Sequence, residues 1–550
     1  MFFFVNNALN KQNSGIEHAQ IQRAYVFDQY KSDYKLVYMA YNPKQALWLD
    51  RFKLQSKHIV NLFDYYQQTL DVPFKKVSPE DIFLSDVSVK YVPVDGKNTY
   101  LVVQESNNVL VGRINWYEDF DFKQVSSVER FDLYGNLYRV DEYDVRGFLS
   151  RSQLYTPDNK IYAYTWFDLE GKPVITQQMT INKDGSYVTG MFEVVDHKGY
   201  RNYYRSFRDV VIKFLNDLND LYFDKHMPNI FVGDRLEGYE DAFMYFDKPA
   251  IKVSHIHNCH ASDVNNVDKS PLNNYYLYDM YNNDQYDFYI CATHKQAKDM
   301  RNRFKLPEDK VVVIPVGLVE DVDKVSMSSR RKHSVLVTAR RAEEKRIDCI
   351  IEAVGLAQKH VPDITLDVYG YRDSRNNDAA KKKIDAMIKK YHLEKAVTIN
   401  DYEPDLDKQR DDHQVYMVFS TMEGFNIALM EAQNHGEVAV VNNVNYGPNE
   451  LVVDGVNGYI VDYNDVKSAS KRLVKLFTDD SLLQTMSNEA YKLSDRYKAN
   501  VIADGWKFIL DKSLTIWKNR KVEEKSYNGL EEFVNSDYNG LFVKKGVSNK

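Results

Sequence analysis

Two basic residues stand in a segment where a strand should pass into a helix. Arg340 and Lys345 lie in TARRAEEKRID, after the apolar run HSVLVT and before a helical stretch that begins near Arg346. A helix N-terminus carries free N–H groups and a positive dipole end, so two cations beside it would form a strong anion site. A diphosphate fits such a site. The alternative is a solvated charge run, because the segment holds four cations and two glutamates.

Two carboxylates follow in the segment STMEGFNIALMEA. Glu423 lies in a loop after the apolar run VYMVFST, and Glu431 lies eight residues further on, within the next helical stretch. Carboxylates only accept hydrogen bonds, so they bind sugar and ribose hydroxyls well. Glu423 is therefore a candidate for contact with a sugar and Glu431 for contact with a ribose. A helix-solvating role for Glu431 remains the alternative.

Three histidines follow another apolar run, in SHIHNCH. His255, His257 and His260 have spacings that invite a zinc interpretation, but no H-E-x-x-H motif is present, and Cys259 has no second cysteine nearby to complete a ligand set. The D-x-D matches are scattered through an acidic chain, which favours chance. The sequence therefore predicts no metal site here and favours one histidine that contacts a substrate near a cleft.

The elements that would position these residues alternate between strands and helices. Apolar runs near 229–234, 250–257, 287–293, 310–317, 333–341, 364–371, 396–402, 415–421 and 437–444 read as buried strands with helical stretches between them. This alternation predicts parallel, doubly wound sheets. At the start, FFFV reads as a strand and 16–30 as a helix, with Ser14 as its N-cap and Gly15 beside it. That helix end is a second candidate phosphate site.

Residues 85–205 have a different sequence pattern. Gly or Asn recurs at 135, 147, 159, 171, 185 and 199, and aromatic and β-branched residues fill the intervals. This spacing predicts successive antiparallel hairpins, that is, a β meander inserted into the first α/β unit. Its many aromatic residues form either its own core or a platform for a partner chain or an acceptor.

The composition bounds the class of protein. The chain has 550 residues, of which 44% are hydrophobic, and 72 basic against 79 acidic residues give a net charge of −7. This balance argues against a broad cationic clamp on nucleic acid. The chain shows no apolar run of bilayer length and no signal-peptide pattern at its start, and its three cysteines are far apart. We expect a cytoplasmic, multidomain chain, with peripheral association at the inner face of the membrane as an option.

Taken together, these motifs resemble retaining glycosyltransferases of family four, which have the GT-B fold. The resemblance is carried by Arg340/Lys345, Glu423/Glu431 in EGFNIALMEA, the SGIEHAQ loop and HNCH, and by IPVG, DVYG and YGPNELVVDGVNGYIV further along. The inserted meander and the start NSGIEHAQIQR are similar to a narrower branch of bacterial enzymes. Those enzymes glycosylate serine-rich adhesins or polyol-phosphate wall teichoic acids.

The resemblance implies a domain organisation. It places an N-terminal Rossmann-like acceptor domain at 1–84 and 206–315, the inserted sheet at 85–205, and a C-terminal nucleotide-sugar-binding domain at 316–495. A C-terminal helix at 496–520 and a tail at 521–550 complete the chain. In this branch the insertion serves oligomer contacts, a companion glycosyltransferase subunit or acceptor binding.

The resemblance also implies the activity and its residues. The donor would be UDP-GlcNAc or UDP-glucose, transferred with retention to Ser or Thr of a surface-destined, serine-rich protein. The alternatives are α-glycosylation of polyglycerol- or polyribitol-phosphate, an inactive GT-B binding subunit and, more distantly, a sugar-nucleotide epimerase. The expected catalytic residues are Arg340, Lys345, Glu423 and His257, and the expected donor-binding residues are Ser14, Gly15, Gly424, Phe425, Asn426, Ile427 and Glu431.

In that mechanism Arg340 and Lys345 stabilise the negative charge that develops on the leaving diphosphate. With two such cations no metal or other cofactor is expected. His257 is preferred over His255 because HNCH keeps the H-x-x-H spacing. Asn426 stands where a glycine is common after E-G-F, so the sugar pocket is expected to differ there.

Overall fold

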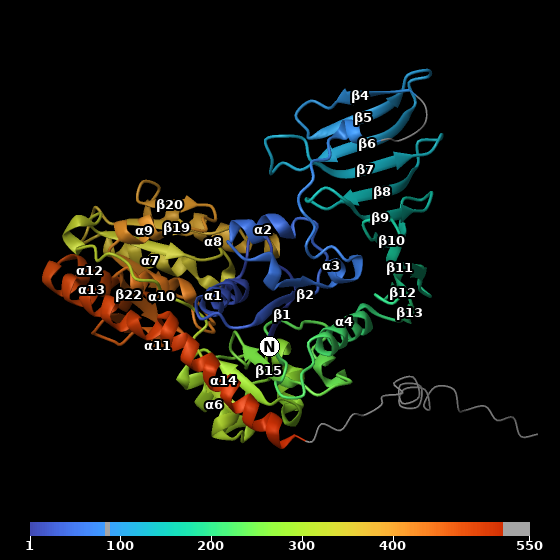
Figure 1. Cartoon of the computed structure of the whole chain (residues 1–550). Helices are drawn as coiled ribbons and strands as arrows, with labels where there is room; N and C mark the ends of the chain where they lie inside the picture. The colour runs from blue at the N-terminus through green and yellow to red at the C-terminus, as the bar shows by residue number, and fades with distance from the viewer. Residues whose placement is uncertain (83–87, 521–550) are drawn as a thin grey trace, which may run out of the picture.

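The computed structural model describes residues 1–82 and 88–520, and the expected tail at 521–550 lies outside the described residues. Two α/β units lie side by side, and a long antiparallel sheet projects from the first of them (Figure 1). The expectation of an α/β fold with parallel sheets and an inserted meander is confirmed. Within residues 1–82 and 88–520, every helix is too short or too polar to cross a lipid bilayer.

The N-terminal unit is built on a seven-stranded parallel sheet in the order β17-β16-β15-β14-β1-β2-β3. Its strands are β1 (Phe2–Asn6), β2 (Tyr34–Tyr38), β3 (Ile59–Asn61), β14 (Ile230–Gly233), β15 (Ile251–Ile256), β16 (Phe288–Cys291) and β17 (Val311–Val313). Its helices are α1 (Gly15–Gln29), α2 (Gln45–Arg51), α3 (Leu62–Gln67), α4 (Phe207–Leu221), α5 (Leu277–Tyr281) and α6 (His294–Phe304). The strands are apolar on both faces because helices cover both sides.

The C-terminal unit has a six-stranded parallel sheet in the order β20-β19-β18-β21-β22-β23. Its strands are β18 (Ser334–Thr338), β19 (Thr365–Tyr369), β20 (Val397–Asn400), β21 (Val415–Val418), β22 (Val438–Asn442) and β23 (Gly458–Val461). Its helices are α7 (Ile347–Ala357), α8 (Arg375–Tyr391), α9 (Asp407–Asp412), α10 (Ile427–Asn434), α11 (Pro448–Leu451), α12 (Val466–Phe477) and α13 (Asp480–Ser494).

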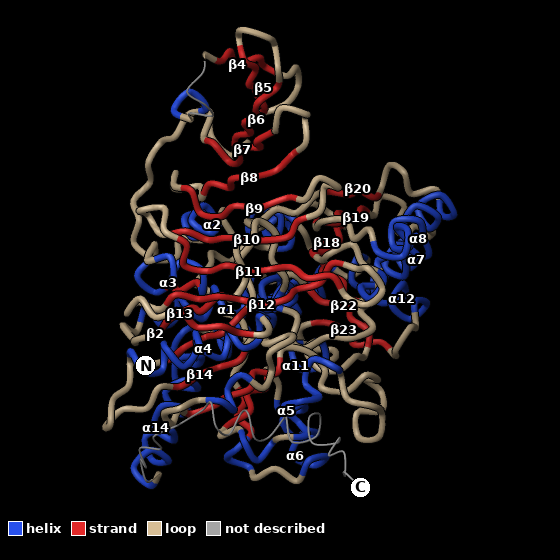
Figure 2. Tube along the Cα trace, turned by 90° about the vertical axis from the view of Figure 1, so that its right-hand side faces the viewer, coloured by secondary structure: helices blue, strands red, loops and turns tan. Residues whose placement is uncertain are grey.

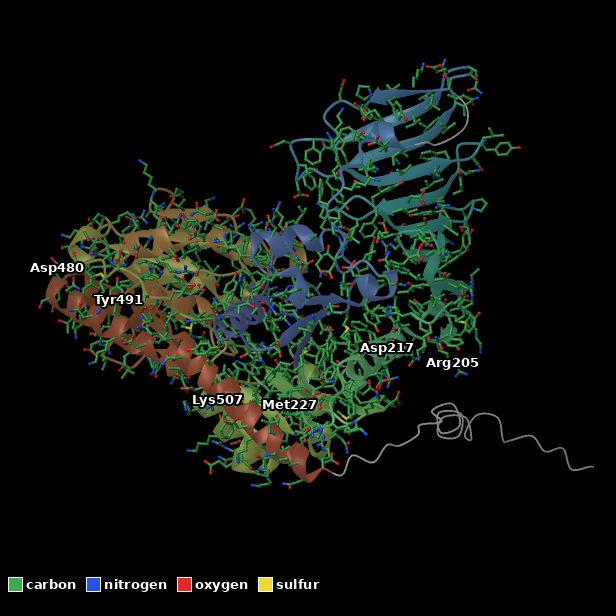
Figure 3. All side chains as sticks on the ribbon, in the orientation of Figure 1. Arg205, Asp217, Met227, Asp480, Tyr491 and Lys507 are labelled. Carbon is green, nitrogen blue, oxygen red and sulfur yellow. The ribbon has the colours of Figure 1, made fainter. Side chains whose placement is uncertain are left out.

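The last helix, α14 (Ala499–Asn519), runs from the C-terminal unit back across the N-terminal unit (Figure 1). Figure 3 marks this path with Tyr491 on α13 and Lys507 on α14. Trp506 packs against the rings of Phe2, Phe4 and Phe27, with centroid distances of 5.3–5.8 Å. The helix therefore joins the core of the N-terminal unit and ties the two units together.

The inserted sheet is a ten-stranded meander in sequence order. Its strands are β4 (Val89–Pro93), β5 (Thr99–Gln104), β6 (Leu110–Trp116), β7 (Val125–Phe131), β8 (Leu137–Tyr143), β9 (Leu149–Tyr155), β10 (Ile161–Phe167), β11 (Pro173–Ile181), β12 (Tyr187–Val195) and β13 (Arg201–Tyr204). All six recurring turn residues have positive φ, between 59° and 92°. That is the left-handed region that glycine and asparagine adopt most easily, which explains the repeat.

The two ends of the inserted sheet are packed differently. Near β10–β12, Trp166, Ile175 and Phe192 enter the same core as Phe63 and Phe214 of the N-terminal unit. The other end projects away from both units, as Figure 2 also shows with β4–β7 above the rest of the molecule, and has a small core of its own. The sequence analysis offered the sheet's own core or a platform for a partner chain or an acceptor, and at this end the structure shows a further arrangement, in which the N-terminal unit covers Trp166 and Phe192.

Candidate functional site

A cleft of about 840 Å³ lies between the two α/β units. Loops that follow β14 and β15 form its N-terminal wall, together with the start of α1. Loops that follow β18, β19 and β21 form its C-terminal wall, together with α10. Ligands of open α/β sheets bind at the carboxyl ends of the strands, so both sheets present their binding edge to this cleft. No residue of the inserted sheet lines it among the described residues.

The two expected cations lie on the C-terminal wall, and each already has carboxylate partners. Arg340 pairs with Glu344 and, at 2.8 Å, with Asp373. Lys345 Nζ donates to Glu423 Oε1 at 2.7 Å. The Arg340 side chain is one-third exposed and that of Lys345 is 24% exposed, so both can be reached from the cleft. Carboxylates hold these cations in place until an anion competes for them.

The loop from Glu423 to Ile427 crosses the middle of the cleft. Asn426 has φ 79° and caps α10 by accepting a hydrogen bond from Leu429 N at 3.0 Å. It also donates to Glu423 Oε1 at 3.2 Å. Glycine adopts this left-handed region most easily, and asparagine more easily than most other residues, which explains why Asn426 can stand in a position where glycine is common. Phe425 is buried against Tyr497, and Ile427 begins α10 on the cleft wall.

At Gly424 the C-terminal wall of the cleft lies against the backbone of the N-terminal wall. A methyl group in place of its hydrogen would lie 1.9 Å from the backbone oxygen of His257 and 2.9 Å from Cα of Asn258. Both neighbours are backbone atoms, which cannot rotate away. The absence of a side chain at Gly424 therefore sets how closely the two walls approach.

Glu431, on α10, is held by residues from both units. Its carboxylate pairs with the buried Arg410 and accepts a hydrogen bond from Gln22 Nε2 at 3.1 Å. Gln22 belongs to α1, and its Oε1 accepts from Leu318 N at 2.8 Å. The carboxylate is about a quarter exposed, so it retains access to the cleft.

At the start of α1, Ser14 forms the expected N-cap. Ser14 and Glu17 make a reciprocal capping box, and Arg235 donates to Ser14 Oγ at 3.1 Å while pairing with Glu17 at 3.0 Å. Gly15 has open space where a side chain would be. The backbone of this helix end is thus accessible to a ligand, as a phosphate site requires.

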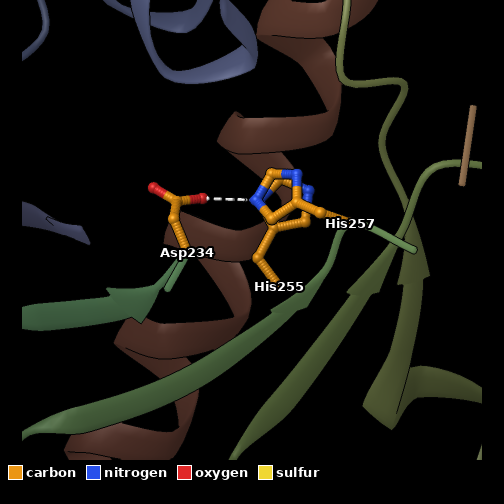
Figure 4. A group of neighbouring side chains, drawn as sticks. All are labelled: Asp234, His255 and His257. Carbon is orange, nitrogen blue, oxygen red and sulfur yellow. Dashed lines mark hydrogen bonds and ion pairs between the residues drawn. The ribbon is translucent and has the colours of Figure 1, made fainter. Parts of the chain in front are cut away.

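The sequence analysis missed the group that organises the N-terminal wall. Asp234, which directly follows β14, accepts hydrogen bonds from His257 Nε2 at 2.8 Å and His255 Nδ1 at 3.1 Å (Figure 4). Arg23 pairs with the same carboxylate at 2.7 Å, and Gln20 donates to it at 3.2 Å. An aspartate after the buried strand NIFVG was the available signal, but its partners are far away in the sequence.

Burial opposes ionisation of this carboxyl group, yet Arg23 and the two histidines outweigh it and hold the pKa of Asp234 well below its ordinary value. Burial also lowers the pKa of both histidines, that of His255 to about 3, although Asp234 opposes the effect. The two histidine rings lie side by side against the same carboxylate oxygen of Asp234, and their ring centroids are 3.9 Å apart. His255 and His257 are therefore neighbours, both of them line the cleft, and each side chain is 2% exposed. They differ in their second ring nitrogen, because His255 Nε2 is buried without a partner among the described residues and His257 Nδ1 is not among such atoms.

Asp234, His255 and His257 present ligand atoms within 4.8 Å of one another, which is close enough for a metal ion. The guanidinium of Arg23 lies 2.7 Å from the same carboxylate and 3.4 Å from His255 Nδ1. A dication would therefore face a fixed positive charge. Arg23 fills the role of the cation, and the group fits a hydrogen-bonded cluster better than a metal site.

Two family models match parts of the chain. Residues 320–493 match the family "Glycosyl transferases group 1", and residues 94–187 match the family "GtfB middle domain". The chain is 24% identical to the UDP-N-acetylglucosamine–peptide N-acetylglucosaminyltransferase GtfA subunit of Streptococcus pneumoniae, over 93% of this chain and 99% of that protein. It is 22% identical to the poly(ribitol-phosphate) α-N-acetylglucosaminyltransferase of Staphylococcus aureus, over 81% and 85%.

Among solved structures, the chain is similar to the pneumococcal O-GlcNAc transferase GtfA in complex with UDP and GlcNAc. The TM-score is 0.78 at 22% identity, and the match covers 93% of this chain and 99% of that one. At this identity the likeness establishes the fold, which has the GT-B arrangement of two α/β units around a cleft.

Proposed function

We propose that the chain transfers a hexose, GlcNAc or glucose, from a UDP-sugar to Ser or Thr of a surface-destined, serine-rich protein. The match of residues 320–493 to the family "Glycosyl transferases group 1" supports this. The observation that carries the proposal is the placement of Arg340, Lys345, Glu423 and Glu431 together on one wall of the cleft. The likeness to GtfA over nearly the whole length of both chains supports it.

The charges support a division of work on this wall. As the bond to the sugar breaks, negative charge grows on the diphosphate, and Arg340 and Lys345 can exchange their carboxylate partners for it. Glu431 accepts hydrogen bonds from the ribose and Glu423 from the hexose. Retention of configuration is part of the proposal, with the acceptor entering on the face that the phosphate leaves.

The charge of the cleft favours a protein acceptor over a polyol-phosphate. Four Lys or Arg side chains line the cleft, and eight carboxylates do so. The cations are Arg235, Arg340, Lys345 and Arg410, and the carboxylates are Asp234, Glu237, Glu240, Asp279, Glu344, Glu403, Glu423 and Glu431. The donor diphosphate occupies two of the cations, and Arg410 and Arg235 are paired with Glu431 and Glu17. A polyanionic acceptor would find no free cation among the lining residues and would meet Glu237 and Glu240.

The test is release of UDP from a panel of UDP-sugars in the presence of a serine-rich peptide or of polyribitol- or polyglycerol-phosphate. We expect release with UDP-GlcNAc or UDP-glucose and the peptide. Release only with a polyol-phosphate would support the teichoic acid alternative, which the staphylococcal relative keeps open. No release and no binding of UDP would support the alternative of an inactive binding subunit.

The proposed reaction needs no metal ion or other cofactor. The support is the pair of cations on the donor wall and the guanidinium that lies against Asp234, His255 and His257, the one group of three or more possible metal ligands found in the described part of the chain. Turnover should therefore survive excess EDTA. If EDTA abolished activity and added Mg²⁺ or Mn²⁺ restored it, the proposal would be contradicted. EDTA presaturated with Ca²⁺ is the control for effects of the chelator itself.

The inserted sheet is proposed to contact another polypeptide chain, either a second copy or a companion subunit. The match to a GtfB middle domain and the word "subunit" in the name of the pneumococcal relative support this. Leu133 and Tyr134, at the tip of the β7–β8 hairpin, are 82% and 90% exposed. Replacing both by Ser should reduce association measured by light scattering, whereas Tyr281→Ser, at a 74% exposed residue of α5, should not. Unchanged association in the double variant would remove the hairpin from the interface.

The cytoplasm is the proposed location. All three cysteines are buried free thiols, which supports a reducing environment. Contact with the inner face of the membrane stays part of the proposal.

A further inference from the structure

The carboxylate of Asp234 is saturated with donors. Oδ1 accepts from Arg23 Nη2 at 2.7 Å, His257 Nε2 at 2.8 Å and His255 Nδ1 at 3.1 Å. Oδ2 accepts from Arg23 Nη1 at 3.1 Å and Gln20 Nε2 at 3.2 Å. A carboxylate offers about four lone-pair directions. Asp234 therefore has none left with which to attack a sugar or take a proton, although it lies on the cleft wall.

An ionised carboxylate only accepts hydrogen bonds, so the proton in each histidine contact must sit on the histidine. His257 thus carries its proton on Nε2, and His255 carries its proton on Nδ1. In a neutral imidazole the remaining nitrogen is an acceptor. For His257 that nitrogen is Nδ1, and for His255 it is Nε2, which is buried and has no partner among the described residues.

Burial favours the neutral ring of His257 and holds its pKa below the usual value. Asp234 opposes this through its hydrogen bond and its charge, and the positive charges of Arg23 on α1 and Arg235 after β14 add to the effect of burial. A neutral ring with its proton held on Nε2 has one hydrogen-bonding group left for a ligand, the lone pair of Nδ1.

The backbone around His257 is fixed as well. Tyr276 Oη accepts hydrogen bonds from the backbone N–H groups of His257 at 3.0 Å and Asn258 at 2.9 Å, and Gly424 of the opposite wall lies against the same peptide. Because the backbone is held in place and Nε2 is bound to Asp234, the ring has little freedom to turn Nε2 toward the cleft in place of Nδ1.

We propose that Asp234, clamped by Arg23 and Gln20, is a positioning residue that fixes the tautomer of His257, so that Nδ1 accepts a hydrogen bond from a hydroxyl group of the bound substrate. The proposal rests on the glycosyl-transfer function in that the hydroxyl belongs to a sugar nucleotide or its acceptor. Orienting a histidine through a carboxylate behind it is a general way to place a lone pair accurately.

The first test does not need activity. Protein labelled with ¹⁵N-histidine should show, at pH 7, a His257 ring with Nε2 protonated and Nδ1 bare, and the signals are identified by their absence in His257→Asn. A ring protonated on Nδ1, or on both nitrogens, would overturn the proposal even if the glycosyltransferase activity is real. This measurement on the wild-type chain also stands if Asp234→Asn fails to fold.

The second test is a double-mutant cycle on turnover. Asp234→Asn should lower kcat by about tenfold or more, and UDP affinity should stay within about twofold because Asp234 is not one of the expected donor-binding residues. In a His257→Asn background, Asp234→Asn should change kcat by less than about twofold, since its effect passes through His257. Independent, multiplying losses would contradict the proposal, as would equal losses in UDP affinity and kcat. Absence of any turnover in the wild type would count against the proposed function and leave the tautomer measurement as the test.

The chain offers a matched control. Asp367 on β19 also accepts from an arginine, Arg331, at 2.6 Å and from a histidine, His413, at 3.1 Å, but it does not line the cleft. Asp367→Asn should leave both kcat and UDP affinity within about twofold of the wild type. A tenfold loss of kcat in this variant would show that disturbing any such cluster has the same effect, and would remove the special role of Asp234.

Discussion

The two walls of the cleft differ in how their charged side chains are exposed and paired. On the C-terminal wall, Arg340 and Lys345 are partly exposed, and each holds a carboxylate that an incoming anion can replace. On the N-terminal wall, Arg23 and Asp234 are buried, and their partners satisfy the carboxylate completely. The first arrangement keeps charge available for a ligand, and the second uses charge to fix geometry.

This difference matches the demands of glycosyl transfer. The leaving diphosphate needs cations that can change partners, because its charge grows as the bond breaks. The substrate hydroxyls need acceptors that do not move, because orientation is lost when the groups around them are free to turn. Variants on the two walls should therefore fail in different ways.

The largest expected effect lies on the donor wall. Arg340→Ala or Lys345→Ala should each lower turnover by about 10²-fold, because each removes charge stabilisation that is worth roughly 3 kcal/mol in the transition state. The measurement is UDP release under saturating donor. Lys381→Ala is the control, since Lys381 pairs only with Asp385 on α8, away from the cleft. Turnover like that of the wild type in both variants would remove the donor role of this wall.

Contact between the walls should matter next. Gly424→Ala places a methyl group against the backbone of His257, so the two walls must move apart. We expect turnover to fall by about tenfold or more while UDP binding changes less, because Arg340, Lys345 and Glu431, the main expected contacts of UDP, all lie on one wall. Calorimetry with UDP and a turnover assay measure the two effects. Normal turnover would show that the walls separate during the reaction.

The two glutamates should divide donor binding. Glu431→Ala should weaken UDP and UDP-sugar by a similar factor, about tenfold, because the ribose is common to both. Glu423→Ala should weaken the UDP-sugar more than UDP, since it contacts the hexose. Calorimetry with the two ligands compares them. Equal losses for both ligands in both variants would refute the division.

The smallest effect concerns stability rather than activity. His260 is fully buried, and neither of its ring nitrogens has a partner among the described residues. Burial lowers its pKa to about 4. The unfolded chain then binds a proton that the folded chain does not, so stability falls as the pH drops from about 6.5 towards 4, by on the order of 3 kcal/mol from this residue. The free energy of unfolding, measured with urea at a series of pH values, should depend less on pH in this range in His260→Phe than in the wild type. An unchanged pH dependence would contradict the lowered pKa of His260.

Local signals in the sequence explain what could be foreseen. The turn residues of the meander were recognisable because six positions need positive φ, and Ser14 was recognisable as a cap because Glu17 stands three residues on. The cleft cations and the two glutamates followed from their places after strands. Each of these features depends on residues close together in the chain.

Packing between residues far apart in the chain could not be predicted from the sequence. Trp506 joins Phe2 and Phe4 in one core across about five hundred residues, and Trp166 of the inserted sheet packs on Phe63 of the N-terminal unit. The same holds for the site: Arg23, Asp234 and His257 come from three distant segments. Periodicity and spacing within a segment do not reveal such contacts, because each of these residues is equally compatible with an ordinary structural role in its own segment.

The most direct test of the account is a crystal structure of the chain with UDP. The account predicts phosphate oxygens within hydrogen-bond distance of Arg340 and Lys345, the ribose hydroxyls on Glu431, and Asp234 still bound to His257 as in the free protein. UDP bound away from Arg340 and Lys345, or a diphosphate held by the N-terminal wall in their place, would contradict it.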